Sequence, residues 1–187
     1  MTAAVARVEV ETCRSGPVGR ATAVAVSTYA MVTVAHAFEG ARSFLVRGPD
    51  GVAREAELVH LDVERDVAVL RSAQPFAEPL PLGSPVDDGS AAFVSAGDAD
   101  AVRVDDVEVR RQVWVRLDDG ARRRAIEVGA DIVPGDSGGP IVVDDEVVAM
   151  VFASSRRSAR GWALDVTELE AAIEEADVSA PVALTCP

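Results

Sequence analysis

The most constraining feature of the chain is a series of short segments in which apolar and polar residues alternate. Val5–Glu11, for example, reads Val-Ala-Arg-Val-Glu-Val-Glu. A period of two is typical of antiparallel strands with one face in the core and one in water. We therefore expect an all-β protein with two sets of six strands. The expected strands are residues 5–11, 21–26, 30–35, 43–47, 53–60 and 67–71, then 92–95, 102–109, 113–117, 125–128, 141–143 and 147–152.

One helix is expected after the last strand. Thr167 and Glu170 have the spacing of a capping box, which marks a helix start. Leu169, Ala172, Ile173 and Ala176 then recur on one helical face. Many short strands with one terminal helix favour barrels or a sandwich.

The expected boundary between two lobes lies in a segment rich in proline, glycine and aspartate, residues 79–90. It separates an N-terminal lobe, residues 1–85, from a C-terminal lobe, residues 86–187.

Composition excludes several classes of protein. The 187 residues are 49% hydrophobic and 26% charged, as in folded proteins. A net charge of −13 opposes binding to phosphate backbones, so no nucleic-acid partner is expected. No apolar run is long enough to span a membrane. Because the start does not have the pattern of a signal peptide, we expect a cytoplasmic protein, or a secreted one if a leader was removed from the sequence shown.

Two cysteines, Cys13 and Cys186, lie near opposite ends of the chain. They make no disulfide framework, and with only two histidines there is no zinc-type cluster, so no metal is expected. A reducing compartment favours free thiols, whereas an extracellular location predicts an oxidised Cys13–Cys186 pair. Their redox state stays open at this point.

Three short blocks carry residues suited to nucleophilic catalysis. His36 ends the apolar block 32–36, Asp66 directly precedes the apolar block 67–70, and Ser137 lies in Gly-Asp-Ser-Gly-Gly-Pro at 135–140. A serine hydroxyl becomes a useful nucleophile when a base takes its proton, and an imidazole can do so near neutral pH. A carboxylate then orients the imidazole, and backbone N–H groups of a glycine-rich turn can stabilise an oxyanion.

These blocks resemble the chymotrypsin-like, or trypsin-like, serine peptidases, and the surrounding sequence looks most like the bacterial HtrA/Deg branch. The resemblance extends from about residue 19 to residue 173. Beyond the three blocks it rests on Pro81-Leu82-Gly83-Ser84, Ile132-Val133-Pro134-Gly135 and Gly161-Trp162-Ala163-Leu164-Asp165-Val166. It implies two six-stranded antiparallel β-barrels, with the reactive groups in the cleft between them and a C-terminal α-helix.

The resemblance also implies roles for single residues. His36 would be the general base, Asp66 its orienting carboxylate and Ser137 the nucleophile. The backbone N–H groups of Gly135 and Ser137 would form the oxyanion hole. The edge strand that pairs with substrate would comprise Phe152, Ala153 and Ser154.

Asp131 lies six residues before Ser137, where trypsin-like members carry the carboxylate of the primary specificity pocket. A carboxylate there favours cleavage after Arg or Lys, whereas the HtrA/Deg branch usually has a small apolar residue and prefers aliphatic residues. Three arginines in the next loop, Arg156, Arg157 and Arg160, would be able to neutralise Asp131. The primary specificity therefore stays open between basic and aliphatic residues.

The chain departs from the resemblance in three places. It has no Ile-Val-Gly-Gly start, whose new amine pairs with the residue at the Asp136 position in trypsin-like zymogens. Asp136 must then bind an arginine or backbone N–H groups, or its loop stays disordered until a partner binds. Residues 19–23 read Gly-Arg-Ala-Thr-Ala in place of the usual Gly-Ser-Gly, and no PDZ module follows the helix.

Two functions remain as hypotheses. The first is a serine endopeptidase that hydrolyses protein or peptide substrates through an acyl-enzyme intermediate, with no metal or organic cofactor. The second is a latent or regulatory peptide-binding module with a protease fold, which an activating partner protein would switch on.

Overall fold

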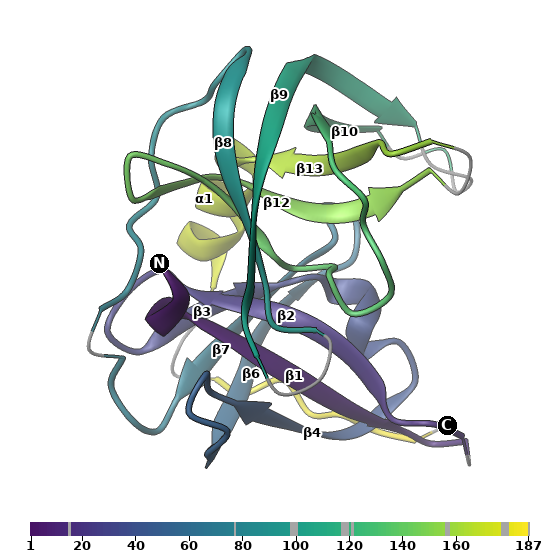
Figure 1. Ribbon diagram of the computed structural model, residues 1–187. Coiled ribbons are helices and arrows are strands. Elements are labelled where there is room, and N and C mark those ends of the chain that lie inside the picture. The colour runs from purple at the N-terminus through teal and green to yellow at the C-terminus, as the bar shows by residue number, and fades with distance from the viewer. Residues whose placement is uncertain are drawn as a thin grey trace.

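The alternating segments form two antiparallel β-sheets, and one α-helix packs against strands of both sheets (Figure 1). The computed structural model describes residues 1–14, 16–76, 78–97, 101–116, 120, 122–155, 158–176 and 180–186. Among the expectations above, Arg156 and Arg157 lie outside these ranges.

The first sheet has seven strands in the order β5-β4-β1-β2-β3-β7-β6. Its strands are β1 (Val5–Thr12), β2 (Gly19–Ala25), β3 (Ala30–Thr33), β4 (Ala41–Arg47), β5 (Ala53–Arg54), β6 (Ala56–Asp62) and β7 (Val67–Ser72). Two short 3₁₀ helices accompany them, η1 (Thr2–Ala4) and η2 (Ala35–Phe38). His36 therefore lies in η2, just past the end of β3.

The second sheet is a closed barrel in the order β10-β13-β12-β11-β8-β9. Its strands are β8 (Gly89–Ser95), β9 (Arg103–Arg116), β10 (Arg122–Gly129), β11 (Pro140–Val143), β12 (Glu146–Ser154) and β13 (Gly161–Asp165). Before β8, the stretch that contains Leu82 pairs locally with β12, since Gly83 N donates to Val147 O and Val147 N donates to Pro81 O. The linker thus follows the surface of the second barrel.

The helix α1 (Val166–Glu175) follows β13 directly and packs against β6, β7, β12 and β13, so it contacts both sheets. Its N-cap is Asp165, whose carboxylate accepts from Thr167 N at 3.0 Å. The predicted capping box of Thr167 and Glu170 is therefore wrong by two positions. Asp165 takes this place because it ends β13 in an extended conformation, which is the usual backbone geometry of an N-cap.

The predicted double-barrel, all-β fold with a C-terminal helix is confirmed, with four differences in detail. One is β13, which has no counterpart among the expected strands. The first sheet is an open seven-stranded sheet and not a closed six-stranded barrel. The expected strand 53–60 is two strands, because β5 pairs with β4 while β6 pairs with β7 at the opposite edge. The expected strands 102–109 and 113–117 are one strand, β9, in which the pairing with β10 skips Arg110 as a bulge and so shifts the alternation.

Cys13 and Cys186 are joined by a disulfide, with Cα atoms 5.5 Å apart. Of the two redox states that the sequence left open, the structure shows the oxidised pair. The C-terminal segment reaches Cys13 by passing β6, where Val182 N donates to Leu58 O. The end of the chain therefore lies along the edge strand that the open first sheet leaves without a neighbour on that side (Figure 1).

Two groups of buried apolar residues form the interior. One fills the second barrel and contains Phe93, Ile126 and Val151. The other fills the first sheet and continues under α1 to Leu164 and Leu169, so the two lobes share it. Within the described ranges, no helix is long and apolar enough to cross a membrane.

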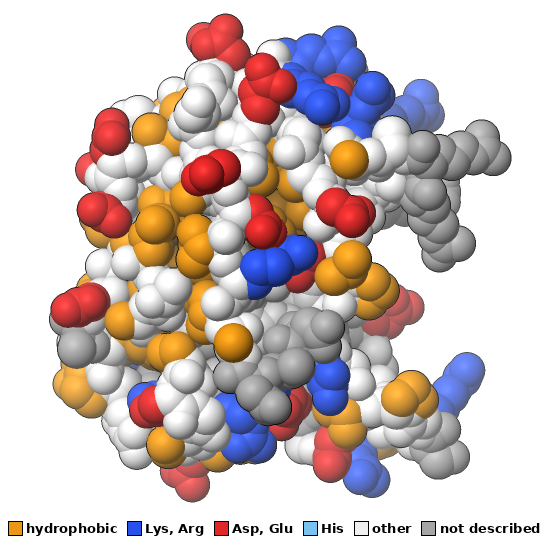
Figure 2. All heavy atoms as spheres, viewed as in Figure 1, with side chains coloured by type: hydrophobic (Ala, Val, Ile, Leu, Met, Phe, Trp, Pro, Cys, Tyr) orange, Lys and Arg blue, Asp and Glu red, His pale blue; other side chains and the backbone are white. Residues whose placement is uncertain are grey.

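Charge is unevenly distributed over the surface. Figure 2 shows arginine side chains gathered where β9 ends, whereas acidic side chains are spread over the rest of the viewed face. The arginines of β9 and β10 are Arg103, Arg110, Arg111, Arg116, Arg122, Arg123 and Arg124. Two of them, Arg103 and Arg123, extend toward the region where the lobes meet, as described next.

Candidate active site

His36 and Asp66 form the best-defined polar contact between two of the predicted site residues. The Asp66 carboxylate lies 2.8 Å from His36 Nδ1 through Oδ2 and accepts from the His36 backbone N–H at 2.8 Å through Oδ1. An ionised carboxylate only accepts, so Nδ1 carries the proton and, in the neutral imidazole, Nε2 keeps its lone pair. The Asp66 side chain is 6% exposed and that of His36 is 45% exposed. The ring is thus oriented by a buried carboxylate while remaining accessible.

The backbone around Asp66 has an unusual conformation. Asp66 ends the turn between β6 and β7 with φ of +63°, in the left-handed region that aspartate tolerates better than most residues. Its carbonyl accepts from Ala35 N at 3.2 Å. Together with the two contacts to His36, this bond ties the turn to η2.

Ser137 lies in a turn that is held between the two lobes. Its carbonyl accepts from Thr22 N on β2 at 2.8 Å, and Gly138 N donates to Val151 O on β12 at 2.7 Å. Gly138 has φ of +89°, and a Cβ atom there would lie 1.9 Å from Thr22 O. Only glycine fits this position, because any side chain would push the serine turn away from β2.

Hydrogen bonds of Thr22 link the turn of Ser137 to β3, the strand that precedes His36. Thr33 Oγ1, at the end of β3, donates to Thr22 O at 2.6 Å, and Thr22 N holds the Ser137 carbonyl. Among the described residues, the Ser137 hydroxyl makes no hydrogen bond with His36. The structure therefore joins His36 to Asp66 directly and places the Ser137 turn against β2, the neighbour of the strand β3 that leads to His36.

Two backbone N–H groups of the serine turn are available as donors. Asp136 N donates to Val133 O, and the amides of Gly138 and Gly139 are also bonded. The amides of Gly135 and Ser137 donate to no residue that the structure describes. These two groups flank Asp136 in the sequence and have no acceptor among the described residues.

Asp136 is buried, at 2% exposure, and its carboxylate is fully engaged. Oδ1 accepts from the Ser95 hydroxyl, while Oδ2 lies 2.6 Å from Arg103 Nη2 and accepts from Val133 N at 2.9 Å. The sequence left either an arginine or backbone N–H groups as the partners of Asp136 within the chain, and the structure shows one of each kind. The turn before Ser137 is thereby held by groups within the chain.

Thr22 is a buried polar residue that sequence reasoning missed. Its hydroxyl donates to Gly135 O at 3.0 Å and accepts from Ala96 N at 3.1 Å. The Gly135 backbone also packs on Gly97, where a Cβ atom would lie 2.0 Å from Gly135 O. In the sequence, residues 19–23 stand out only as a departure from Gly-Ser-Gly. The role of Thr22 has no local signal, because its hydroxyl bonds to residues of the second lobe.

Comparisons with known proteins show the family and the fold of the chain. Residues 21–150 match the family model of the trypsin-like peptidase domain. The chain belongs to the trypsin-like peptidase family. It is accordingly a serine endopeptidase by class, as predicted. No curated protein matches the peptidase in a sequence search.

Solved structures share the fold of the peptidase at low sequence identity. The active form of the Rv3671c protease from M. tuberculosis has a TM-score of 0.87 and 22% identity, and the match covers 99% of this chain and 86% of that one. The inactive form of the same protease has a TM-score of 0.79 and 20% identity, with 95% and 90% covered. The HtrA-type protease AlgW with a tripeptide has a TM-score of 0.80 and 23% identity, with 92% and 58% covered. The peptidase thus has the fold of HtrA-type proteases.

Asp131 lies exposed between β10 and the serine turn, and it has no hydrogen bond or ion pair with a described residue. Arg160 is not its partner, because Arg160 Nε lies 3.1 Å from Glu127 Oε1. Glu127 also binds Arg111 at 2.9 Å. The hydrogen bond from Arg111, followed by the charge of Arg160, outweighs burial and lowers the pKa of the Glu127 carboxyl below its usual value.

The last residues of β12 run past the end of their neighbour β11. β11 pairs with β12 only from Glu146 to Met150, whereas Ala153 and Ser154 pair with β13 on the other side. Phe152 is buried, Ala153 is half-buried and Ser154 is exposed. On the side of β12 that faces away from β13, residues 152–154 therefore have no strand neighbour within the described part of the chain.

One group of side chains has the composition of a metal site. Ligand atoms of His60, Asp62 and Glu175 lie within 4.8 Å of one another. The Arg65 guanidinium binds both carboxylates, Asp62 and, at 3.1 Å, Glu175. Burial raises the pKa of the Asp62 carboxyl, but the Arg65 backbone N–H and guanidinium outweigh burial and keep that pKa low. Arg65 thus supplies the positive charge that the carboxylates of this cluster bind.

Proposed function

We propose that this serine peptidase cleaves peptide bonds with Ser137 as nucleophile, His36 as general base and acid, and Asp66 as the carboxylate that orients His36. The observation that carries the proposal is the pair of 2.8 Å contacts from Asp66 to His36, beside a serine turn anchored on β2. The contact to Nδ1 favours the tautomer in which Nε2 can accept a proton, and the backbone contact holds the carboxylate in place.

In the proposed reaction, His36 accepts and returns each proton that is transferred. Ser137 Oγ attacks the substrate carbonyl carbon as its proton passes to His36 Nε2. The amides of Gly135 and Ser137 donate to the resulting oxyanion. His36 then gives the proton to the departing amine, and an acyl-enzyme remains. Water attacks the ester as His36 takes one of its protons, which returns to Ser137 Oγ when the acid product leaves.

Substrate would bind in an extended conformation along residues 152–154. The outer edge there has free backbone groups and lies next to the serine turn, since Gly138 N bonds Val151 O. An extended peptide can add to such an edge through main-chain hydrogen bonds. The substrate class that fits is a protein or peptide with an unfolded segment.

A fluorophosphonate probe tests the nucleophile. We expect the probe to label the wild-type protein in a stoichiometric reaction, and Ser137→Ala to abolish both labelling and hydrolysis of an unfolded protein such as casein, a loss of about six orders of magnitude in kcat. The matched control is Ser90→Ala, which removes an exposed hydroxyl on β8. Equal labelling of wild type and Ser137→Ala would refute the assignment, and peptide binding without turnover would favour the latent module.

Asp131 is proposed to contribute weakly to specificity for basic residues. An exposed carboxylate without an internal partner can bind a substrate cation, but exposed ion pairs are worth only about 0–1 kcal/mol, a factor of about five. We expect Asp131→Ala to lower turnover after Arg and Lys by about fivefold or less in a mixed peptide library. Asp88→Ala, at another exposed aspartate, should leave the profile unchanged. An unchanged profile for Asp131→Ala would refute the proposed contribution of Asp131.

A further inference from the structure

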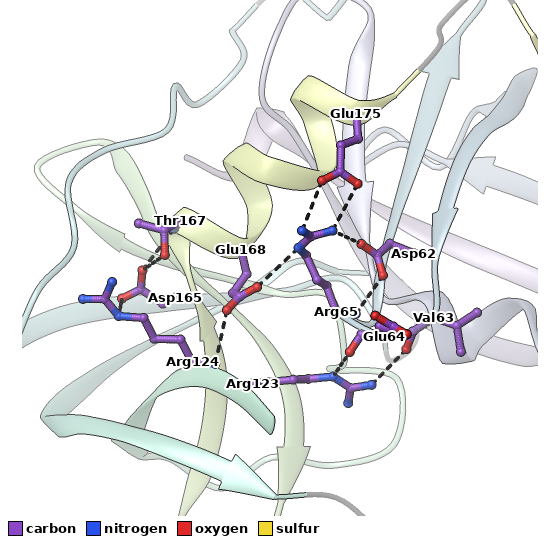
Figure 3. Close-up of polar contacts among 10 residues, drawn as sticks. All are labelled: Asp62, Val63, Glu64, Arg65, Arg123, Arg124, Asp165, Thr167, Glu168 and Glu175. Atoms are coloured by element: carbon purple, nitrogen blue, oxygen red, sulfur yellow. Dashed lines mark hydrogen bonds and ion pairs between the residues drawn. The ribbon is translucent and has the colours of Figure 1, made fainter. Parts of the chain in front are cut away.

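Arg123 is a buried arginine of the second barrel that reaches the turn carrying Asp66 in the first lobe. It is 7% exposed and lies near the start of β10. Nε donates to Glu64 O at 2.8 Å and Nη2 donates to Val63 O at 3.0 Å. Figure 3 shows the guanidinium meeting these two consecutive carbonyls side by side. The planar fork of arginine suits such a pair of acceptors, which the ammonium of lysine cannot match.

The same guanidinium contacts two residues of the candidate active site. Nη1 lies 3.9 Å from Asp66 Oδ2, the oxygen that is 2.8 Å from His36 Nδ1. Its Cζ lies 5.7 Å from the centre of the Phe152 ring, in a cation–π contact. Arg123 therefore connects the Asp66 turn with the first residue of the proposed substrate edge.

The Asp66 turn needs support from outside its own strands. A left-handed backbone at a non-glycine residue costs free energy and persists where surrounding contacts hold it. On one side of the turn, Arg65 points toward α1 and binds Glu168 and Glu175 (Figure 3). On the other side, Arg123 binds the two carbonyls that precede Arg65 in the chain. The groups that hold the turn therefore belong to β10, in the case of Arg123, and to α1, in the case of Glu168 and Glu175.

We propose that Arg123 is a positioning residue for the general base: it holds the Asp66 turn so that the carboxylate stays in register with the His36 imidazole. This inference rests on the proposed function. Arg123 acts through Asp66 and Phe152 and does not touch the reacting atoms. Because it belongs to β10, the geometry of the base in one lobe depends on the docking of the other lobe, which carries Ser137.

Arg123→Met tests the proposal, since methionine keeps an unbranched apolar stem and removes the guanidinium. We expect kcat per active site, counted by fluorophosphonate titration, to fall about 10- to 100-fold, because a shift of the order of 1 Å in a catalytic group has such an effect. KM should change by less than about threefold, as uniform substrate binding is retained. The far-downfield proton NMR signal of His36 Nδ1–H should move or broaden.

Two further variants separate positioning from folding. Arg122→Met removes the neighbouring exposed arginine, which contacts Trp114, and should retain wild-type kcat. Arg123→Lys restores a cation and one donor, so it should recover part of the kcat lost in Arg123→Met when both variants are fully folded. Equal kcat for Arg123→Met and wild type would overturn the proposal. So would equal activity of the Lys and Met variants, or losses that only follow the fraction of folded protein in thermal unfolding.

The NMR signal distinguishes this inference from the proposed function. If the wild-type protein fails to react with the probe, the nucleophile assignment fails. The role of Arg123 is then judged from the His36 signal alone, which Arg123→Met should alter and Arg122→Met should not. An unaltered signal in Arg123→Met overturns the positioning role whether or not the protein is active.

Discussion

Replacing Asp66 with asparagine should lower kcat/KM for peptide hydrolysis by about four orders of magnitude. In this structure the carboxylate receives both the Nδ1–H and the backbone N–H of His36, each at 2.8 Å. An asparagine side chain has one oxygen and one NH₂ group. If the oxygen keeps the backbone N–H, the NH₂ group faces Nδ1 and imposes the opposite tautomer, in which Nε2 is protonated and cannot act as a base.

The comparison requires folded protein, so kcat/KM is measured alongside chemical denaturation. Loss of the charge near Arg123 should destabilise the variant by about 1–3 kcal/mol, as expected for hydrogen bonds to charged groups. Asp87→Asn, at an exposed position, serves as the control and should change neither quantity. Activity within tenfold of wild type in fully folded Asp66→Asn would contradict the role assigned to this carboxylate.

Replacing Asp136 with asparagine should lower kcat by about 10²- to 10³-fold, the loss typical of a disrupted oxyanion hole. Asp136 lies between the two proposed oxyanion donors, and its carboxylate binds Ser95, Arg103 and Val133 N. An amide cannot accept at both of its heavy atoms, so at least one of these contacts is lost and the serine turn becomes free to rearrange. KM should change much less than kcat, because the groups affected act on the transition state.

The matched control for this prediction is Asp105→Asn. Asp105 also binds Arg103, at 3.1 Å, but it is half exposed and lies on β9 away from the serine turn. It should leave kcat within about twofold, since exposed ion pairs contribute little. If Asp136→Asn keeps wild-type kcat per titrated site, the internal ion pair is not what holds the turn, and the role assigned to Asp136 is refuted.

The fold was predictable because strands and turns are specified locally. Alternation such as that of Val5–Glu11 predicted strands that the structure confirms, and the helical spacing of Leu169, Ala172 and Ile173 predicted the helix that forms α1. Errors arose where pairing across a sheet overrides local pattern. Arg110 breaks the alternation of β9, yet the strand continues because a bulge opposite β10 accommodates it. Asp165, and not Thr167, caps α1 because the end of β13 sets the backbone there.

The candidate site was predictable only in part. His36, Asp66 and Ser137 were proposed from motifs, and the structure places Asp66 Oδ2 2.8 Å from His36 Nδ1. Thr22, Arg103 and Arg123 have no local signal, since each acts on a residue far along the chain. In a chain with 18 arginines, nothing in the sequence distinguishes Arg103 and Arg123, which bind the turns of the candidate site, from the others.

Strand periodicity, glycine-rich turns and reactive side chains are properties of neighbouring residues, so the amino-acid sequence predicts the type of architecture and the chemical groups of the candidate site. The contacts that support these groups appear only in the folded chain: Arg103 binds the serine turn, Arg123 binds the Asp66 turn, and Cys13 is bonded to Cys186. Such contacts join residues from different strands and lobes. Their partners are selected by how the two sheets dock, which no local pattern encodes.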